Sequence, residues 1–509
     1  MFRVISKVKR CRVTLLQWKN KIQGNVRENI EAIKCQLQEL KTRDFEGKRD
    51  VRNGLKKSLK EAYRNEEMYW SQKARVQWLK TGDKNTSFFH ATVEGGRKRN
   101  RMLEIQRENG TWTNGEKELG AEVADYYKHL FSASETREME EVLDGIPHTI
   151  SNSMNENLTK PVGEEEIRSA LFSMYPDKAP GIDGMPSLFF QKFWHIVKKD
   201  LVGAIQTFFH TGHLSKSVNH TIISLIPKGN IPTSLTHYRP ISLCSTVYKI
   251  IAKILACRLK PTLQSCISKN QSAFIPGRQI LDNIMISHDF LHYLENKKFG
   301  KDGFMAVKLD MSKTYDRVEW RFLEAIMQKM GFNDKWRSWI MECISSVSYS
   351  FMINGEVKEY VIPQRGIRQG DPLSPYLFLL CSEGFSNLLN KAATAQRIAG
   401  MRISRQGPRL THLFFADDSL IFCKADSQNA TELRRLRQVY ERGTGQLINF
   451  DKSSVMFSPN LERESKMEIC QALGNIQVAT QGKYLGLPMV ITAQNSNYSA
   501  SLKTTSSEK

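Results

Sequence analysis

Two adjacent carboxylates, Asp417 and Asp418, lie between two apolar runs in the segment Leu413–Cys423. Apolar runs on both sides of a short polar step are typical of a tight β-hairpin, here with an acidic tip. Two like charges in an apolar frame cost free energy unless a cation neutralises them. A divalent metal would do so, and metals held by paired carboxylates carry out phosphoryl transfer. An acidic β-turn without a ligand explains this short segment equally well, because Asp and Ser favour turns.

A third carboxylate follows another apolar run, Phe304–Leu309, which predicts a strand that ends at Asp310. If this strand lies beside the hairpin, Asp310 and Asp417 complete a site for two metal ions, which sit about 3.5–4 Å apart. Asp310 is also compatible with the N-cap of a helix over 311–320. Tyr315 either packs beneath a bound sugar or is an ordinary core aromatic.

The segment Gln364–Pro375 combines glycines, arginines and prolines between the two carboxylate elements. Glycine lets the backbone approach a ligand closely, and arginine suits phosphates or the faces of bases. The segment therefore predicts a ligand-binding loop. We expect Pro372 to open the helix that follows, which is apolar on most faces and continues to about Ala393.

Local patterns predict several other elements. Two alternating runs flank Asn354-Gly355, which indicates a β-hairpin with a type I′ turn over 348–362. Proline and glycine at 176–186 indicate a loop with special backbone angles. The other predictions are a turn at Asn109-Gly110, an amphipathic stretch that ends at Leu130-Phe131, a helix over 187–212, a strand over 221–226 and helical periodicity over 245–265.

Positive charge is concentrated at the N-terminus of the chain. The whole chain carries a net charge of +21, and residues 1–100 hold 25 Lys and Arg against 11 Asp and Glu. This excess indicates a polyanionic partner, either nucleic acid or a membrane surface. Residues 13–80 predict one or two long basic helices, for which a solvated helical linker is the alternative. Basic and aromatic residues interleave over 75–102, which suits backbone neutralisation and base stacking.

Several classes of protein are disfavoured by what the sequence lacks. No apolar stretch approaches the roughly 20 residues needed to span a bilayer. The nine cysteines are scattered without a C-x-x-C pair, which argues against a zinc ribbon and against a disulfide framework. A reducing compartment fits this cysteine usage best.

The order of these elements resembles the reverse transcriptases of non-LTR retrotransposons, specifically the LINE type found in plants. Lys308–Trp320 resembles the first palm motif of that family, Gln364–Pro375 resembles the second, and Phe415–Asp418 is similar to its Phe-Ala-Asp-Asp box. Further matches are Ala179–Gly184 to the N-terminal finger extension, Leu225–Lys228 and Tyr238–Leu243 to the fingers, Gly445–Ser453 to a later palm motif, and Tyr484–Pro488 to the primer grip.

The resemblance implies a role for each matching residue. Asp310 and Asp417 would ligate two Mg²⁺ ions, or Mn²⁺ as an alternative, with help from Asp418 and the Met311 carbonyl. Tyr315 matches the steric gate that rejects a ribose 2′-OH. The remaining matches are Lys228, Arg239, Gln369 and Gly370 around the nucleotide, Lys452 as a candidate acid for the leaving pyrophosphate, and Tyr484, Leu485 and Gly486 in the primer grip.

The chain also departs from the family pattern. Thr314 stands where the family usually has Ala, and its hydroxyl lies beside the expected gate. The resemblance covers roughly residues 60–490 and includes neither the endonuclease nor the thumb of complete elements. We therefore expect a fragment or the product of a degraded element.

The resemblance implies an α/β (α+β) right-hand polymerase with fingers, palm and a long helical N-terminal extension. The expected divisions are 1–102 for the extension, 103–165 for a connector, 166–300 for the finger extension and fingers, 301–490 for the palm with the primer-grip motif, and 491–509 for a flexible tail.

The implied reaction is RNA-templated DNA synthesis from dNTPs by two-metal attack of a primer 3′-OH. The implied partners are an RNA template and a DNA primer or target, with no membrane. The implied location is intracellular, in the nucleus with a cytoplasmic RNA-bound stage. A non-catalytic nucleic-acid-binding remnant and an intron-maturase-like protein are the alternatives, whereas Tyr315 disfavours an RNA-templated RNA polymerase.

Overall fold

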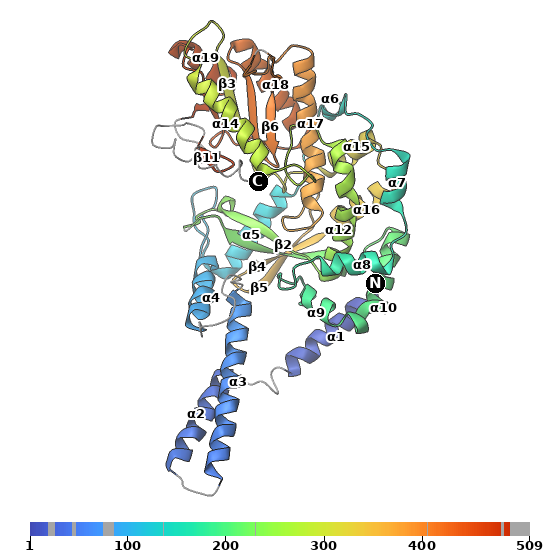
Figure 1. Ribbon diagram of the computed structural model, residues 1–509, viewed down its shortest axis with the longest axis vertical. Helices are drawn as coiled ribbons and strands as arrows, with labels where there is room; N and C mark the ends of the chain where they lie inside the picture. Colours follow the sequence, from blue (N-terminus) through green and yellow to red (C-terminus); the bar gives the residue numbers. More distant parts are fainter. Residues whose placement is uncertain are drawn as a thin grey trace.

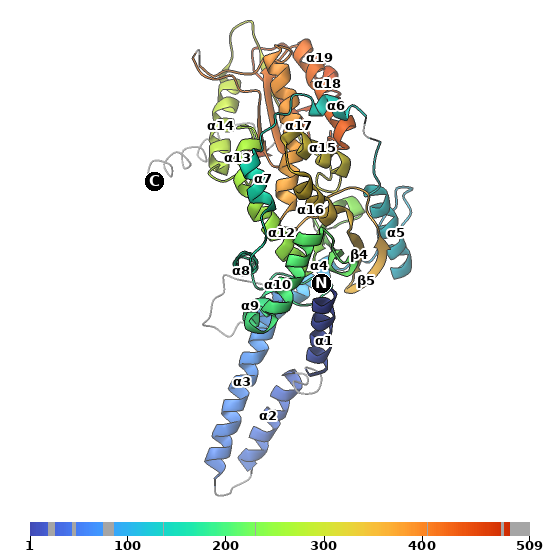
Figure 2. The same ribbon diagram turned by 90° about the vertical axis from the view of Figure 1, so that its right-hand side faces the viewer.

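The computed structural model describes residues 1–18, 26–42, 47–74, 86–135, 137–229, 231–404, 406–479 and 483–488. Two β-sheets with helices packed around them form the body of the protein, and a pair of N-terminal helices projects from one end (Figures 1 and 2). This architecture confirms the expected mixed α/β class. The predicted tail over 491–509 lies outside the described residues.

The five-stranded sheet has the strand order β6-β7-β3-β8-β9. The central strand β3 pairs antiparallel with β7 on one side and with β8 on the other, and β6 and β7 form the predicted acidic hairpin. The strands are β3 (Phe304–Leu309), β6 (His412–Phe415), β7 (Asp418–Lys424), β8 (Ser454–Phe457) and β9 (Gln477–Val478).

Helices cover both faces of this sheet. Val307 and Ile421 lie in the main core with α17 and α18, whereas Ala306 and Phe422 face the opposite side and pack with α14. Because both faces are buried, the central strands read as nearly continuous apolar runs rather than as an alternating pattern. The covering helices are α14 (Ile280–Asn296), α17 (Ser374–Thr394) and α18 (Ser427–Thr444).

The four-stranded sheet has the order β2-β1-β4-β5. Asn354 and Gly355 have φ values of 52° and 94°, so the predicted type I′ turn between β4 and β5 is confirmed. The β4–β5 hairpin pairs with β1, a strand from the segment 166–300. This sheet therefore crosses the expected boundary between fingers and palm at 300/301. The division into domains stays a prediction. The strands are β1 (His220–Pro227), β2 (Tyr238–Leu243), β4 (Ser348–Ile353) and β5 (Glu356–Val361).

Two predicted helices need correction at their ends. The helix expected over 187–212 is two helices, because Phe193 leaves the helical region with φ −101° and ψ 22°. The helix expected to begin at Pro372 begins at Ser374, with Pro375 in its first turn, where a missing amide hydrogen costs nothing. The two helices over 187–212 are α9 (Ser187–Lys192) and α10 (Trp194–Thr211).

The N-terminal region is helical, as expected, but its first helix begins at Phe2. Val4 and Val8 of α1 are buried in the main core, and Arg3 and Lys7 pair with Asp200 of α10. A small core that includes Ile30, Ile33 and Ala62 holds α2 and α3 together as the projecting hairpin. The helices are α1 (Phe2–Trp18), α2 (Val26–Thr42), α3 (Lys48–Ala74) and α4 (Thr86–Asn100).

The loop over 176–186 anchors helix α12 (Thr246–Leu259). The Asp183 carboxylate accepts a hydrogen bond of 2.7 Å from the Thr246 amide and so caps the first turn of α12. Gly181 lies so close to Cys244 that a Cβ would stand 2.4 Å from the Cys244 carbonyl carbon. Gly184 has φ +66°. The prediction of special backbone angles in this loop is therefore confirmed.

The other elements complete the frame. The nine cysteines form no disulfide. Within the described segments, none of the helices has the length and apolar character needed to cross a membrane. The remaining helices are α5 (Gly115–Leu130), α6 (Met139–Leu143), α7 (Asn152–Thr159), α8 (Glu164–Phe172), α11 (Lys216–Asn219), α13 (Leu263–Cys266), α15 (Trp320–Met330), α16 (Asp334–Ser345) and α19 (Arg463–Ala472), the short 3₁₀ turns are η2 (Leu235–His237) and η3 (Lys260–Thr262), and the last strands are β10 (Lys483–Tyr484) and β11 (Leu487–Pro488).

Candidate active site

The three predicted carboxylates lie at the same end of the five-stranded sheet. The last pair between β3 and β7 is Leu309 with Ser419, and Asp310 directly follows Leu309. Phe415 pairs with Asp418, so Ala416 and Asp417 form a two-residue turn between β6 and β7. The structure thus brings together the two carboxylate elements that the sequence placed on separate strands.

Asp310 is not a helix cap. The residues after it form turns, and α15 begins only at Trp320, with Glu319 as its N-cap. The Asp310 backbone is held from the other side, since its amide donates to the Ser453 hydroxyl at 3.1 Å and its carbonyl accepts from the Asn449 amide at 2.7 Å. The carboxylate is left to face the hairpin.

The carboxylates interact unfavourably with one another. Burial, with the nearby Asp417 charge, raises the pKa of Asp310, and burial followed by the charges of Asp417 and Asp310 raises the pKa of Asp418. None of the ion pairs between described residues involves these three side chains. A bound cation would relieve this repulsion, as the sequence argument anticipated.

The donors present fit a magnesium-type ion rather than a closed metal cage. Among the described residues, no group of three or more His, Cys, Asp or Glu side chains forms a metal-binding cluster. Mg²⁺ is usually held by one or two carboxylates while waters and substrate phosphates complete the octahedron. Asp310 and Asp417, with the Met311 carbonyl, supply oxygen donors of that kind.

Thr314, the departure from the family pattern, contacts a carboxylate. Its hydroxyl lies 3.5 Å from Asp417 Oδ2 and 3.4 Å from the Met311 carbonyl oxygen, and the residue is buried. The added hydroxyl therefore faces Asp417 and the Met311 carbonyl.

A cavity of about 1120 Å³ opens beside Asp310. Lys228, a predicted nucleotide-binding residue, and Lys452, the candidate acid, line it. Burial first, and then the charges of Lys452 and Arg239, lower the pKa of Lys228, which shows that the three predicted cations lie near one another. A cleft with clustered cations beside carboxylates suits a triphosphate.

Lys313 is a cavity residue that the sequence analysis missed. It has φ 53°, its ammonium donates to the Tyr238 carbonyl at 3.3 Å, and burial lowers its pKa to about 8. The neighbouring Asp316 is buried, and burial raises its pKa to about 6. The lysine lies three residues after Asp310, which is the one signal that could have found it.

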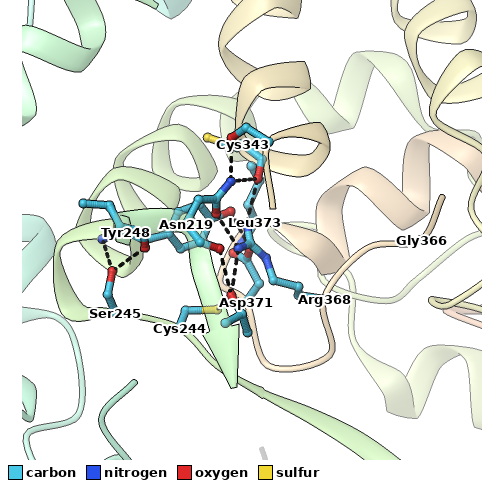
Figure 3. A network of polar contacts seen from close by, with 12 residues as sticks. Asn219, Cys244, Ser245, Tyr248, Cys343, Gly366, Arg368, Asp371 and Leu373 are labelled. Atoms are coloured by element: carbon cyan, nitrogen blue, oxygen red, sulfur yellow. Dashed lines mark hydrogen bonds and ion pairs between the residues drawn. The ribbon is translucent and has the colours of Figure 1, made fainter. Parts of the chain in front are cut away.

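Both arginines of the Gln364–Pro375 loop are buried. Arg365 still reaches the cavity beside Asp310, whereas Arg368 points into the protein, so the expectation that the arginines face phosphates or bases is wrong for Arg368. The Arg368 guanidinium is buried: it donates to Asn219 Oδ1 at 2.6 Å, pairs with Asp371 at 3.2 Å and stacks on Tyr248 (Figure 3). Arg365 pairs with buried Glu319 at 3.1 Å. A loop without regular hydrogen bonds needs such internal partners to hold one shape.

The predicted nucleotide-binding residues Gln369 and Gly370 directly follow buried Arg368 in this loop. The Gln369 carbonyl accepts from the Ser242 amide of β2 at 2.8 Å, and its side-chain amide donates to Asp316 at 3.3 Å. Gly370 has φ 100° and is exposed. Gln369 and Gly370 thus lie beside β2, and Gln369 also contacts the turns that follow β3.

Tyr315 packs on Phe378 of α17, with ring centroids 5.3 Å apart and planes 19° from parallel. Burial, with the nearby Asp417 charge, raises its pKa. The ring is therefore both a core contact and a neighbour of the carboxylates, and the two alternatives raised by the sequence are compatible.

The primer-grip motif forms a second small hairpin, in which β10 pairs with β11. Leu485 and Gly486 have φ values of 48° and 87°, the signature of a type I′ turn. Tyr484 is buried, and its hydroxyl donates to Asn283 at 3.1 Å. Tyr484 therefore anchors the hairpin, Leu485 packs against the same core, and Gly486 is exposed.

A buried polar network lies behind the acidic hairpin. Glu383 of α17 accepts from the Ser268 amide at 3.1 Å. The Ser268 hydroxyl contacts Ser386 at 2.8 Å, and Ser386 contacts His412 of β6 at 2.9 Å. Burial raises the pKa of Glu383 to about 7, against an ordinary value of 4.5.

We expect Glu383 to make stability depend on pH. Between about pH 4.5 and 7 the folded state keeps a proton that the unfolded state has released, so the free energy of unfolding falls as pH rises. Glu383→Gln keeps the acceptor and removes the titration. As pH rises across this range, the free energy of unfolding of the variant should increase relative to that of the wild type by up to about 3 kcal/mol. Urea unfolding at a series of pH values measures it, with exposed Glu464→Gln as the control; parallel curves for wild type and Glu383→Gln would contradict the prediction.

Comparison with known proteins extends these observations. Residues 226–489 match the family model described as reverse transcriptase (RNA-dependent DNA polymerase). The chain is 28% identical over 452 residues to the "Transposon TX1 uncharacterized 149 kDa protein" of Xenopus laevis, which covers 88% of this chain and 34% of that protein. It is 25% identical over 302 residues to the Pol polyprotein of the retrotransposable element R2 of Popillia japonica, which covers 58% of this chain and 39% of that protein.

A shorter match is closer in sequence. The chain is 54% identical over 69 residues to an uncharacterized mitochondrial protein of Arabidopsis thaliana, which covers 14% of this chain and 57% of that protein. The chain spans little more than a third of the length of the Xenopus and Popillia relatives.

Proposed function

The chain belongs to the reverse transcriptase family, and from that premise we propose that it is an RNA-directed DNA polymerase of the non-LTR retrotransposon type. It would join a deoxynucleoside triphosphate to a primer 3′-OH on an RNA template. The observation that carries this proposal is that Asp310, Asp417 and Asp418 lie at one end of the five-stranded sheet, beside a cavity lined by Lys228 and Lys452. The plant LINE assignment stays a prediction.

The proposed roles follow from the placement of each group. Asp310, Asp417 and the Met311 carbonyl would hold two Mg²⁺ ions, or Mn²⁺, which when bound activate the 3′-OH and offset charge on the leaving pyrophosphate. Lys228 and Arg239 would bind the triphosphate. Lys452 lies in the same cavity and would supply the proton that the pyrophosphate takes up.

The remaining predicted residues would act on the geometry of the substrates. Gln369 and Gly370 would border the new base pair, since they lie where the loop meets β2. The turn at half-buried Leu485 and exposed Gly486 would contact the primer, with Tyr484 as its buried anchor. The proposed partners are therefore an RNA template and a DNA primer, and a nuclear location with a cytoplasmic RNA-bound stage follows from this function.

Extension of a DNA primer on a heteropolymeric RNA template, with Mg²⁺ and all four dNTPs, tests the proposal directly. Templated products should form with the purified chain. Filter binding of the same primer–template runs in parallel. Binding without any extension would overturn the enzymatic proposal and favour a nucleic-acid-binding remnant.

Tyr315 should decide between deoxyribo- and ribonucleotides. A ring beneath C2′ leaves no room for a hydroxyl, so Tyr315→Ala should raise rNTP incorporation relative to dNTP incorporation by roughly two to three decades. The measurement is the ratio of kcat/KM for dNTP and rNTP in both proteins. Thr314→Ala, the adjacent change that leaves the ring in place, is the control. An unchanged ratio with a large loss of stability would assign Tyr315 to the core alone.

The N-terminal region should bind nucleic acid without sequence preference. A groove of about 1240 Å³ lies between this region and the four-stranded sheet, lined by Lys73, Arg97, Arg99 and Arg101 on one side and by Ser224 and Met352 on the other. Arg75, Trp78, Lys80 and Lys84 of the predicted basic–aromatic set lie outside the described residues.

Replacing Arg97, Arg99 and Arg101 together with Gln should weaken RNA and DNA binding alike. The slope of log affinity against log salt should become shallower by about two to three, because each lost phosphate contact removes roughly 0.7–0.9. A matched triple change at exposed Lys298, Lys301 and Arg463 should alter the slope less. An affinity that does not depend on salt would contradict the prediction.

A further inference from the structure

The turn that carries Asp417 has a strained backbone. Its first residue, Ala416, has φ 54°, in the left-handed region that residues with a Cβ rarely adopt. Glycine enters this region without steric cost. An alanine stays there only when surrounding contacts hold it, and such residues cluster at active sites. Any residue that holds the backbone of Ala416 therefore also fixes the position of Asp417, the next residue in the turn.

The side chain of Gln271 contacts both backbone groups of Ala416. Its Oε1 accepts from the Ala416 amide at 3.0 Å, and its Nε2 donates to the Ala416 carbonyl at 3.3 Å. One side-chain amide thus replaces the strand partner that the turn lacks. Gln271 is 1% exposed, so water does not compete for these bonds.

Gln271 is itself held in one orientation. Its Oε1 also accepts from the Ala273 amide at 3.0 Å. The Arg278 guanidinium donates to the carbonyls of Gln271, Ser268 and Ile267. This loop is joined to β6 on the other side, since the Phe414 amide donates to the Asn270 carbonyl at 2.8 Å and the Ser272 amide donates to the Phe414 carbonyl at 3.1 Å. Gln271 is therefore a rigid support.

We propose that Gln271 is a positioning residue for the reaction: its amide holds Ala416 in the left-handed conformation and so presents the Asp417 carboxylate to Asp310. This inference rests on the proposed function for its catalytic consequence. The two hydrogen bonds between Gln271 and Ala416, which we call the clamp, are a property of the folded chain. Gln271 acts on the reaction only through the turn.

The first test is a double-mutant cycle between Gln271 and Ala416. Gln271→Ala should lower kcat roughly 10- to 100-fold with little change in KM for dNTP, because a small displacement of a catalytic group has effects of that size. Glycine needs no clamp to keep a positive φ. In an Ala416→Gly background the same Gln271→Ala change should therefore cause a loss of kcat that is several-fold smaller. An equal loss in both backgrounds would overturn the proposal, since it would show that Gln271 does not act through Ala416.

The matched control is Gln264→Ala. Gln264 lies in the same region and its side chain also donates to a backbone carbonyl, that of Pro276 at 3.0 Å, but it is exposed and does not reach the turn. This variant should keep the wild-type kcat. A loss of kcat equal to that of Gln271→Ala would assign the effect to general loosening of the loop and overturn the proposal.

The second test does not depend on activity. Hydrogen exchange of the peptide that covers 415–419 reports the Ala416 amide, which Gln271 protects. Exchange there should speed up in Gln271→Ala and stay as in the wild type in Gln264→Ala, while exchange across α17 remains unchanged. Unchanged exchange in Gln271→Ala would overturn the clamp. A wild-type chain without polymerase activity would defeat the proposed function alone, because this exchange result would still decide the clamp.

Discussion

Replacing Asp417 with Asn should abolish nucleotide addition, with a fall in kcat/KM of roughly three to five decades, the usual cost of removing an essential catalytic group. Asn keeps the size of the side chain but removes the charge that would bind a metal. Asp310→Asn should cost a similar amount, because each carboxylate comes from a different strand and neither replaces the other. Single-nucleotide extension of a primer on an RNA template is the measurement.

The same substitution should not weaken the fold. The three carboxylates repel one another in a half-buried site, so removing one charge should leave the free energy of unfolding unchanged or raise it. Asp302→Asn is the matched control, since Asp302 lies at the opposite end of the same strand pair and forms an exposed ion pair with Lys424 at 2.7 Å. Asp302→Asn should retain activity within a few-fold. An Asp417→Asn protein within tenfold of wild-type activity would refute the proposed site.

Replacing Arg368 with Met should destabilise the protein by about 3–5 kcal/mol, the range expected when one partner of a buried ion pair is removed. Arg368 is 3% exposed and Asp371 is 4% exposed, so the carboxylate left behind has little access to water. Its remaining contacts with the Tyr248 hydroxyl at 2.6 Å and the Leu373 amide at 2.9 Å do not neutralise the charge (Figure 3). Urea unfolding of the two proteins measures the difference.

Two comparisons make this result specific to the buried pair. The double variant Arg368→Met with Asp371→Asn should lose less than the sum of the single changes, since no unpaired charge is left. Arg137→Met removes an exposed arginine that pairs with Glu135 at 3.1 Å, and it should cost less than about 1 kcal/mol. Equal losses for Arg368→Met and Arg137→Met would show that burial of the pair contributes nothing.

Much of the secondary structure could be predicted because its causes are local. The type I′ turn at Asn354-Gly355 depends on two residues that tolerate a positive φ. The strands β3 and β7 depend on apolar runs, and each run ends beside a carboxylate. The exact ends were harder to predict: Phe193 breaks a helix that the sequence pattern joins, and Pro372 precedes rather than opens α17.

The direction of polar side chains in loops could not be predicted. Arg365 and Arg368 have the residue type that binds phosphate, yet both are buried and paired with acidic residues. Glu319 lies 46 residues before Arg365, so the fold must bring the two side chains together. Asp371 lies only three residues after Arg368, but the contacts that bury this guanidinium, with Asn219 and Tyr248, come from distant parts of the chain. Lys313 was missed for the same reason, because its half-buried position beside Tyr238 depends on contact with β2.

The amino-acid sequence by itself determined the chemical parts of this protein: paired carboxylates on apolar strands, a glycine-rich loop, and an excess of positive charge at the N-terminus. These depend on residue type and spacing along the chain. The tertiary structure decided which groups meet. Gln271 lies 145 residues before Ala416, yet its amide holds the turn. Contacts over such distances form only when strands and helices pack, because loop closure and burial, rather than local preference, bring those atoms together.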